Sequence, residues 1–390
     1  MRVGILSYPM LFQREGGLQV QVRETIAALN RLGQDAAHPL QAELVDPNRE
    51  RLDSYDLIHV FSAINGNYRV VEAASEMGVP VVLSPLLSPG WDRASGFRAR
   101  VADRLAGRLT AWHVQTSYAQ TKKALQLARL VIALGEPERD AIMSGFLIEA
   151  SKIRVFPNGI SRQFFMARPE LFRHRTGITG PFVLMAGTIS PYKNQLGLVQ
   201  ALEGLDLPIV LIGRCARADQ GYLDAVLRSP WVRWLGELQH QDPLLAGAFA
   251  AASVVALPSH GEVFPLAVLE ALAAGTPVVM TDENALDLRE SAFALRKVAW
   301  HDAVGQRAAI QQFLAEPPDR AAVRALVDQY TWQRVASQIA NCYFDLSARL
   351  ATERNAQPLP QRVHPATPLR QAAPAEQGAA LQAEDESGAA

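Results

Sequence analysis

The 390-residue sequence has little cysteine, almost no net charge and no long apolar run, and each shortage excludes a class of protein. Cys215 and Cys342 are too few for a disulfide framework or a thiolate zinc site, so the cytoplasm is the expected compartment. With 38 Lys and Arg against 39 Asp and Glu, a nucleic-acid partner bound through bulk charge is not expected. The weakly polar stretch 244–258 is shorter than the about 18 to 20 residues of a transmembrane helix. The first residues resemble a strand more than a secretory signal.

Several catalytic signatures are also missing. No two glycines are separated by a single residue, which excludes the dinucleotide-binding fingerprint of dehydrogenases, and no glycine precedes a lysine, which excludes the P-loop. The paired-histidine motif of zinc proteases and the serine elbow of hydrolases do not occur either. A ligand must therefore be bound by other means, and the carboxyl ends of the strands are the place to look.

Short runs of Val, Ile and Leu alternate with segments of helical periodicity along most of the chain. Continuous apolar runs are typical of parallel strands that helices cover on both faces. The expected strands are 3–7, 57–62, 79–84, 130–134 and 153–156, followed by 182–186, 209–212, 232–235, 254–257 and 277–280. Apolar residues from 18 to 29 predict a first helix, for which Gly33 is the expected stop.

Two successive blocks of this kind predict an α/β chain with two doubly wound, Rossmann-like domains. A cluster of Asn-Gly, Gly and Pro places the boundary between 157 and 180. The expected bounds are 1–165 for the first domain, 166–331 for the second, 332–354 for a final helix and 355–390 for a disordered tail.

The most informative stretch is 258–275, which follows the expected strand 254–257. Pro265 marks the start of a helix, because proline is tolerated in a first helical turn. Glu262 is therefore expected in the loop before this helix and Glu270 inside it. Since the other helix residues are apolar, a carboxylate among them is costly to bury unless a partner receives it.

The first turn of such a helix offers backbone amides that can bind an anion such as a diphosphate. At about 1.5 Å per residue, Glu270 lies within about 10 Å of that end, so its carboxylate can reach a ribose attached to the phosphates. The spacing alone is equally compatible with Glu270 at a solvent edge and with Glu262 as an ordinary loop charge.

Five segments together resemble the retaining nucleotide-sugar glycosyltransferases of family 4, which have the two-domain GT-B fold. The two glutamates, in the setting P-S-x-G-E-x-F-P-L-x-x-L-E-A-L-A-x-G-x-P-V-V, are similar to the signature of that family. The other similar segments are Gly16-Gly17-Leu18-Gln19, Phe156-Pro157-Asn158-Gly159-Ile160, Gly187 to Asn194 and Tyr330-Thr331-Trp332. The resemblance covers about residues 1 to 350.

The resemblance implies two domains that face each other across a cleft and a final helix that packs back on the first. It implies transfer of a hexose-like sugar, with retention, from a nucleotide diphosphate sugar to a surface-polysaccharide, glycolipid or polyprenyl-linked glycan acceptor. Glu262 would contact the donor sugar, Lys193 would neutralise the leaving diphosphate, and Glu270 would hold the ribose. The further donor-binding residues would be Gly16, Gly17, Thr188, Gly213, Arg214, Val263, Phe264, Pro265 and Leu266. No metal and no cofactor is implied beyond the nucleotide sugar itself.

Three positions depart from the family pattern. Thr188 and Tyr192 stand where many members have an arginine, and Leu86 stands where many have a histidine. Arg214, at the end of the next expected strand, is a candidate substitute for the arginine. These departures leave open the alternative that the chain is a GT-B protein that binds a nucleotide sugar without turnover. An epimerase or phosphorylase of the same fold is the other alternative.

Two further regions have both a structural and a functional interpretation. His59 lies in an apolar strand and is expected to be a core histidine, yet with Asn65 and Asn67 it is also a candidate on the acceptor side. The segment 93–129 has eight Lys or Arg and one acid, interleaved with apolar residues. It is either a solvated helix face or a surface that contacts an anionic membrane, which would place the protein at the inner face of that membrane.

Overall fold

The computed structural model describes residues 1–8, 11–13, 16–35, 39–64, 66–88, 90–109 and 116–356. The chain divides into two units, residues 1–346 and residues 347–390. The second unit is described only over 347–356, which are the last turns of a helix. Both sheets lie in the first unit.

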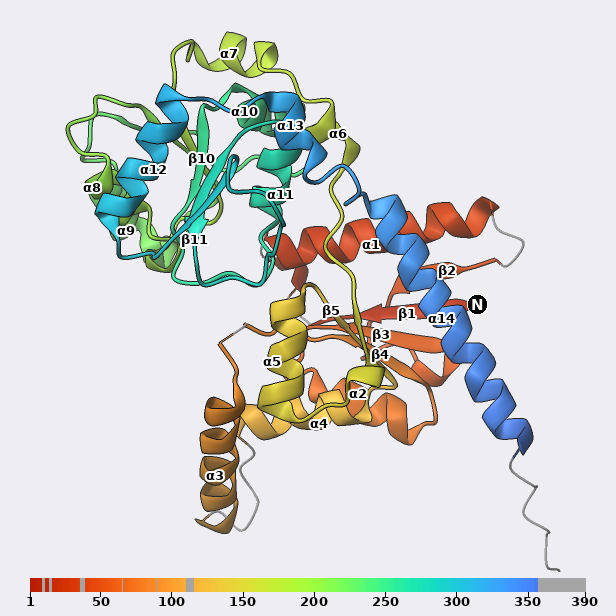
Figure 1. Cartoon of the computed structure of the whole chain (residues 1–390). Helices are drawn as coiled ribbons and strands as arrows, with labels where there is room; N and C mark the ends of the chain where they lie inside the picture. Colours follow the sequence, from red (N-terminus) through yellow and green to blue (C-terminus); the bar gives the residue numbers. More distant parts are fainter. Residues whose placement is uncertain are drawn as a thin grey trace, which may run out of the picture. The chain divides into compact units, whose positions relative to one another are not determined.

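The first half of this unit contains a parallel sheet with the strand order β2-β1-β3-β4-β5-β6 (Figure 1). Its strands are β1 (Arg2–Leu6), β2 (Gln41–Leu44), β3 (Leu57–Phe61), β4 (Val81–Ser84), β5 (Leu130–Ala133) and β6 (Ile153–Val155). Its helices are α1 (Gly17–Asp35), α2 (Tyr68–Glu76), α3 (Arg93–Leu109), α4 (Ser117–Leu127) and α5 (Glu136–Phe146). Buried apolar clusters lie on both faces of the sheet, as the continuous apolar runs predicted.

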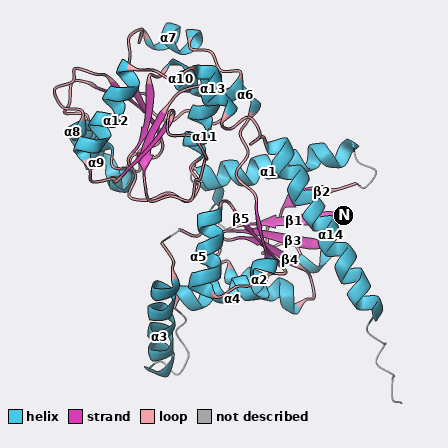
Figure 2. Cartoon of the chain, in the orientation of Figure 1, coloured by secondary structure: helices cyan, strands magenta, loops and turns pink. Residues whose placement is uncertain are grey.

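The second half repeats this architecture, with helices around a second sheet (Figure 2). Its strand order is β12-β11-β10-β7-β8-β9, again entirely parallel. Its strands are β7 (Val183–Ala186), β8 (Ile209–Ile212), β9 (Val232–Trp234), β10 (Val254–Leu257), β11 (Val278–Thr281) and β12 (Leu295–Val298). Its helices are α6 (Arg162–Phe165), α7 (Glu170–Thr176), α8 (Gln195–Ala201), α9 (Gln220–Val226), α10 (Pro243–Ala251), α11 (Leu266–Ala273), α12 (Ala303–Ala315) and α13 (Arg320–Ala325). The predicted class of two doubly wound α/β domains is confirmed.

The chain crosses from the first half to the second slightly earlier than the expected bound at residue 165. Phe164 of α6 is fully buried in the core of the second half, where α6 packs on α10 and α11. The chain crosses back before α14 (Trp332–Ala356), whose buried residues Trp332, Ile339 and Tyr343 pack in the core of the first half. The final helix therefore packs on the first domain, as the resemblance implied.

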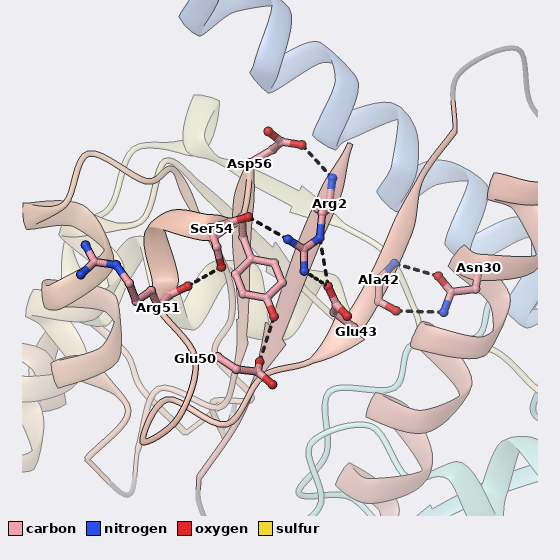
Figure 3. Close-up of polar contacts among 9 residues, drawn as sticks. Arg2, Asn30, Ala42, Glu43, Glu50, Arg51, Ser54 and Asp56 are labelled. Atoms are coloured by element: carbon pink, nitrogen blue, oxygen red, sulfur yellow. Dashed lines mark hydrogen bonds and ion pairs between the residues drawn. The ribbon is translucent and has the colours of Figure 1, made fainter.

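Edge strand β2 has its outer side covered by one side chain of α1. Asn30 accepts a hydrogen bond from the amide of Ala42 at 2.7 Å and donates one to the carbonyl of Ala42 at 2.8 Å (Figure 3). On β1, Arg2 forms a 2.5 Å ion pair with Glu43 of β2, and its amide donates to Asp56. Because an unpaired sheet edge invites pairing with other chains, the two Asn30 hydrogen bonds protect the edge at Ala42, while the Arg2–Glu43 ion pair fixes β2 to β1.

Gly33 does not end the first helix, contrary to the prediction. α1 continues to Asp35, and Gly33 lies within its last turns. A Cβ at this position would lie 1.9 Å from the carbonyl oxygen of Leu40. The glycine therefore permits a close approach between the helix and the segment that leads into β2, a requirement that a turn signal in the sequence does not distinguish from a helix stop.

Candidate active site

A pocket of about 370 Å³ lies at the carboxyl ends of strands in the second sheet. The strand order reverses between β7 and β10, and open α/β sheets bind ligands at such a reversal. The loops after both strands line the pocket, together with the segments after β8 and β9. From the first half, the beginning of α1 and the residues that follow β4 and β5 complete its wall.

Lys193 and Glu262 form an ion pair at the wall of this pocket. Lys193 ends a short turn after β7, and Glu262 lies in the loop between β10 and α11. Nζ of Lys193 lies 2.5 Å from Oε1 of Glu262, and the two side chains are only 23% and 12% exposed. Partial burial strengthens charge interactions relative to the open surface. The pair presents a cation that can meet an anionic ligand beside a carboxylate that can accept from hydroxyl groups.

Tyr192 holds the Glu262 loop, although the sequence drew attention to it only as a departure from a family pattern. Its hydroxyl donates to the carbonyl of Gly261 at 2.8 Å, and its own carbonyl accepts from the amide of His260 at 2.9 Å. The amide of Glu262 donates to the carbonyl of Glu283 at 2.8 Å, which holds the loop from its other side. Burial, followed by the charges of the two glutamates, raises the pKa of Tyr192, so its hydroxyl stays a donor.

Two glycines bring the turns after β7 and β8 together beneath the pocket. Gly187 and Gly213 have φ angles of 153° and 151°, and a Cβ on Gly213 would lie 1.9 Å from the carbonyl oxygen of Gly187. The side-chain amide of Gln195, which is buried, donates to the carbonyl of Thr188 at 2.9 Å and holds this turn. The backbone here can therefore approach a ligand without side chains between them.

Glu270 is the charged residue of α11, whose sequence is LAVLEALA. The helix begins after Pro265 at its N-cap, as predicted, and its first residues line the pocket. Glu270 is only 5% exposed and also lines the pocket. A carboxylate and the amides of a helix N-terminus thus lie on the same side of α11, two turns apart at most.

His240 contacts Glu270, and nothing in the sequence indicated this. Nε2 of His240 lies 2.7 Å from Oε1 of Glu270, and the side chains are 16% and 7% exposed. His240 lies in the loop between β9 and α10 and lines the pocket. The loop residues from 236 to 242 have no periodicity that would bring one of them next to a helix residue thirty positions later, so a single sequence carries no signal for the pair.

The first half contributes a glycine pair and an amide to the pocket wall. Gly16 and Gly17 lie at the beginning of α1, and a Cβ on Gly17 would meet nothing nearer than Leu266 at 3.9 Å. Nδ2 of Asn158 donates to the carbonyl of Phe264 at 3.2 Å. Its Oδ1 is buried and has no hydrogen-bond partner among the described residues, which is uncommon for a buried polar atom and leaves it available to a donor group of a ligand.

The residues predicted for catalysis and donor binding all line this pocket. They are Gly16, Gly17, Thr188, Lys193, Gly213, Arg214, Glu262, Val263, Phe264, Pro265, Leu266 and Glu270. Leu86, at the position of the family histidine, lines it too, with a φ of 56°. The structure therefore brings the predicted residues together, and their individual roles stay predictions.

The candidates for the acceptor side do not line the pocket. His59 is fully buried, with Nδ1 2.6 Å from the hydroxyl of Tyr343 and Nε2 2.9 Å from Oγ of Ser84. Burial lowers the pKa of His59 to about 3. The side-chain amide of Asn67 donates to two backbone carbonyls at the end of β3 and is also buried. The structure thus assigns both residues to the framework of the first half, and Asn65 lies outside the described residues.

Two kinds of feature are not found among the residues that the structure describes. No helix in the described ranges is both long enough and apolar enough to cross a membrane. Within the same ranges, no three side chains of His, Cys, Asp or Glu gather into a group that could hold a metal ion.

The segment that carries these residues matches a known family. Residues 180–315 match the family model described as Glycosyl transferases group 1, and this range includes Lys193, Glu262 and Glu270. The chain is 29% identical over 245 residues to O-antigen chain mannosyltransferase B of Escherichia coli, a match that covers 57% of this chain and 62% of that protein. It is 27% identical over 323 residues to D-inositol 3-phosphate glycosyltransferase of Gordonia bronchialis, covering 74% of this chain and 66% of that one. The chain thus spans about two thirds or less of the length of these curated relatives.

The fold has counterparts among solved structures. HepE of Anabaena, whose crystal structure is in complex with UDP, is similar to this chain with a TM-score of 0.65 and 20% sequence identity. The match covers 88% of this chain and 100% of the HepE chain. The likeness shows the fold, which is the GT-B arrangement of two parallel sheets with helices.

Proposed function

We propose that this chain, which has the GT-B fold and carries the group 1 glycosyl transferase domain at residues 180–315, transfers a sugar from a nucleotide diphosphate donor. The sugar is hexose-like, the configuration at its anomeric carbon is retained, and no metal ion takes part. The observation that carries the proposal is the convergence of Lys193, Glu262 and Glu270 at one pocket beside the N-terminus of α11.

Charge at the leaving group supports this assignment. Sugar transfer makes the donor carbon cationic while the departing diphosphate oxygen gains negative charge, so stabilising that oxygen is the largest electrostatic demand. Lys193 supplies a positive charge that is 23% exposed, and the amides of the first turn of α11 lie at the same pocket. A fixed lysine meets this demand without a metal ion, which is why we assign a metal-independent reaction.

The two glutamates fit the two ends of such a donor. Glu270 is a buried acceptor within reach of a ribose attached to phosphates at the start of α11. Glu262 lies on the Lys193 side of the pocket, where the sugar would follow the diphosphate. Retention follows the family that the sequence resembles, and neither glutamate is assigned as a covalent nucleophile.

The proposed acceptor is a glycan, glycolipid or polyprenyl-linked glycan at the cytoplasmic face of a membrane. The name of the Escherichia coli relative, an O-antigen chain mannosyltransferase, favours a polysaccharide-type acceptor. Helix α3 supports the membrane location, because it exposes Phe97, Leu105 and Leu109 in one row beside arginines. In this proposal α3 rests on anionic lipid and brings the pocket to the acceptor.

Single substitutions test the catalytic assignment. Lys193→Ala and Glu262→Ala should each lower turnover of a nucleotide sugar at least about tenfold, equivalent to roughly 1.4 kcal/mol in the barrier, with the melting temperature little changed. Lys123→Ala is the matched control, because Lys123 forms an ion pair with Glu72 away from the pocket. Near wild-type turnover in both pocket variants would refute the assignment.

The products separate this proposal from its alternatives. Release of nucleoside diphosphate that depends on added acceptor, with a product of unchanged anomeric configuration by NMR, supports a retaining transferase. A nucleotide sugar that binds but is never consumed indicates a binding protein, and consumption without acceptor indicates an epimerase or another activity. Activity that disappears in EDTA and returns with a divalent cation would overturn the metal-independent assignment.

A further inference from the structure

His240 lines the pocket and contacts Glu270. Neither a sequence pattern nor a comparison with known proteins indicated this contact. The 2.7 Å contact joins Nε2 of the imidazole to Oε1 of the carboxylate, so one oxygen of Glu270 is already bonded in the protein. A carboxylate accepts hydrogen bonds on both oxygens. The contact therefore leaves Oε2 as the oxygen that a ligand hydroxyl can use.

His240 is itself held by α6, the first helix after the chain enters the second half. The imidazole lies against the buried ring of Phe164, with 5.4 Å between ring centroids and 47° between planes. The side-chain amide of Gln163 donates to the backbone carbonyl of His240. Packing on one face and a hydrogen bond to the backbone restrict the imidazole to the orientation that meets Glu270.

Restriction of a carboxylate has a definite consequence for binding. A glutamate side chain with free rotamers loses conformational entropy when a ligand orders it, and this loss lowers the affinity for the ligand. Because Glu270 is 7% exposed in its side chain and bonded through Oε1, that entropy is lost on folding instead. The ligand then meets an acceptor that is already oriented.

We propose that His240 is a positioning residue, which orients Glu270 so that its second carboxylate oxygen accepts from a ribose hydroxyl of the donor nucleotide. The inference rests on the proposed function, since it requires a nucleoside diphosphate in this pocket. Because a carboxylate only accepts, Nε2–H of His240 is the donor in this contact. A residue in this role must place a hydrogen-bond donor between the loop after β9 and α11. Among other side chains, the amide of glutamine comes nearest to the imidazole in this respect.

Binding of ribose and dideoxyribose nucleotides tests the inference. UDP and GDP are each compared with their 2′,3′-dideoxy analogues by calorimetry, using the full-length chain. His240→Ala should weaken the better-binding ribonucleotide about fivefold or more, as expected for loss of an oriented hydrogen bond to a charged group, and leave its dideoxy analogue unaffected. His240→Gln should recover part of the loss. His174→Ala, at an exposed histidine of α7, is the matched control.

Glu270→Ala separates failure of this inference from failure of the proposed function. Loss of the preference for ribose in Glu270→Ala, with full preference kept in His240→Ala, would overturn the role of His240 and leave the function standing. An equal loss of both nucleotides in His240→Ala would show that the pair only stabilises the pocket, which also overturns the inference. If none of UDP, GDP, ADP and dTDP binds the wild-type protein, the proposed function and this inference are overturned together.

Discussion

Two fully buried titratable residues in the first half respond to pH in opposite directions. Burial lowers the pKa of His59 from 6.5 to about 3, and burial raises the pKa of Glu138 from 4.5 to about 7. Between pH 6.5 and 3 the unfolded chain binds a proton at His59 that the folded chain excludes, so acid removes stability there. Between pH 4.5 and 7 the folded chain keeps a proton on Glu138 that the unfolded chain has released. The stability from Glu138 is therefore complete at low pH and is lost as pH rises.

The His59→Gln variant isolates the first of these effects. It should be about 1 to 3 kcal/mol less stable than the wild type at pH 7.5, because the hydrogen bonds to Tyr343 and Ser84 are lost or weakened. This deficit should shrink as pH falls from 6.5 to 4, since glutamine does not titrate. Urea unfolding at pH 4, 5.5 and 7.5 measures it. A deficit that stays constant with pH would contradict the account of His59.

Glu138→Gln is the companion variant with the opposite sign. Glu138 accepts hydrogen bonds from the amides of Leu87 and Leu134, both at 2.7 Å, and these lower its pKa against the larger effect of burial. The stability of Glu138→Gln relative to the wild type should fall as pH falls from 7 to 4.5, because only the wild type gains from protonation. The same urea unfolding series measures this difference in stability. A relative stability of Glu138→Gln that rises as pH falls would contradict the account of Glu138.

At the scale of elements, the sequence predicts every inner strand and two of the four edge strands, β6 and β9. All ten predicted strands exist, whereas β2 and β12 were not predicted. The missed strands lie at sheet edges and have the sequences QAEL and LRKV, each with two polar residues among four positions and no continuous apolar run. A continuous apolar run marks a strand that is covered on both faces, so the signal used for the prediction is weakest at an edge.

In the site, too, features that depend on neighbouring residues in the sequence could be predicted, and contacts between distant residues could not. The placement of Glu262 in a loop and of Glu270 in a helix was predicted from a strand end and a helix start, whereas Lys193 was named only through the resemblance to a known family. The contacts of Tyr192 with the Glu262 loop and of His240 with Glu270 join residues 69 and 30 positions apart, respectively. A single sequence does not show which residues that are far apart in the chain lie next to each other in the fold. His59 is the core histidine that its apolar strand predicted, and the alternative acceptor-side role of His59 and Asn67 finds no support in their buried contacts.

Helix α3 is an element whose two faces differ sharply. Its packed face approaches α5 so closely that a Cβ on Gly96 would lie 2.3 Å from the carbonyl oxygen of Gly145. Its outer face exposes Phe97, Leu105 and Leu109 by 61%, 55% and 86%. The exposed charged residues of the helix are all arginines, at positions 93, 98, 104 and 108. An apolar row beside cations and no exposed acid matches the surface of anionic lipid.

Vesicle binding tests this role of α3. The wild type should sediment with vesicles of phosphatidylglycerol and phosphatidylcholine, more weakly with phosphatidylcholine alone, and less as salt rises because exposed charges are screened. The double variant Phe97→Ser with Leu105→Ser should lose most of this binding while keeping its melting temperature. Leu171→Ser, at a leucine of α7 that is 41% exposed, is the matched control. Dimerisation through α3 without lipid binding would contradict the membrane assignment.

At the scale of the whole molecule, the proposed donor contacts come from both sheets. Gly16 and Gly17 lie at the beginning of α1 in the first half, whereas Lys193, Glu262 and Glu270 belong to the second. A ligand that contacts both sides binds only when both halves are folded. Nucleotide binding should therefore stabilise the native unit as a whole, by about 2.7 kcal/mol at a ligand concentration one hundred times Kd.

Gly17→Val tests whether the first half takes part in donor binding. Because a Cβ at Gly17 has open space and its nearest neighbour, Leu266, is 3.9 Å away, the variant should melt within about 1 °C of the wild type without ligand. Its branched side chain extends into the pocket where phosphates would lie, so the rise in melting temperature on adding UDP or GDP should be mostly lost. Gly221→Val, at another exposed glycine near the start of a helix with open space around it, should keep the full rise and serves as control. A full ligand-induced rise in Gly17→Val would show that the second half binds the nucleotide alone, and the part of the donor site assigned to α1 would then have to be abandoned.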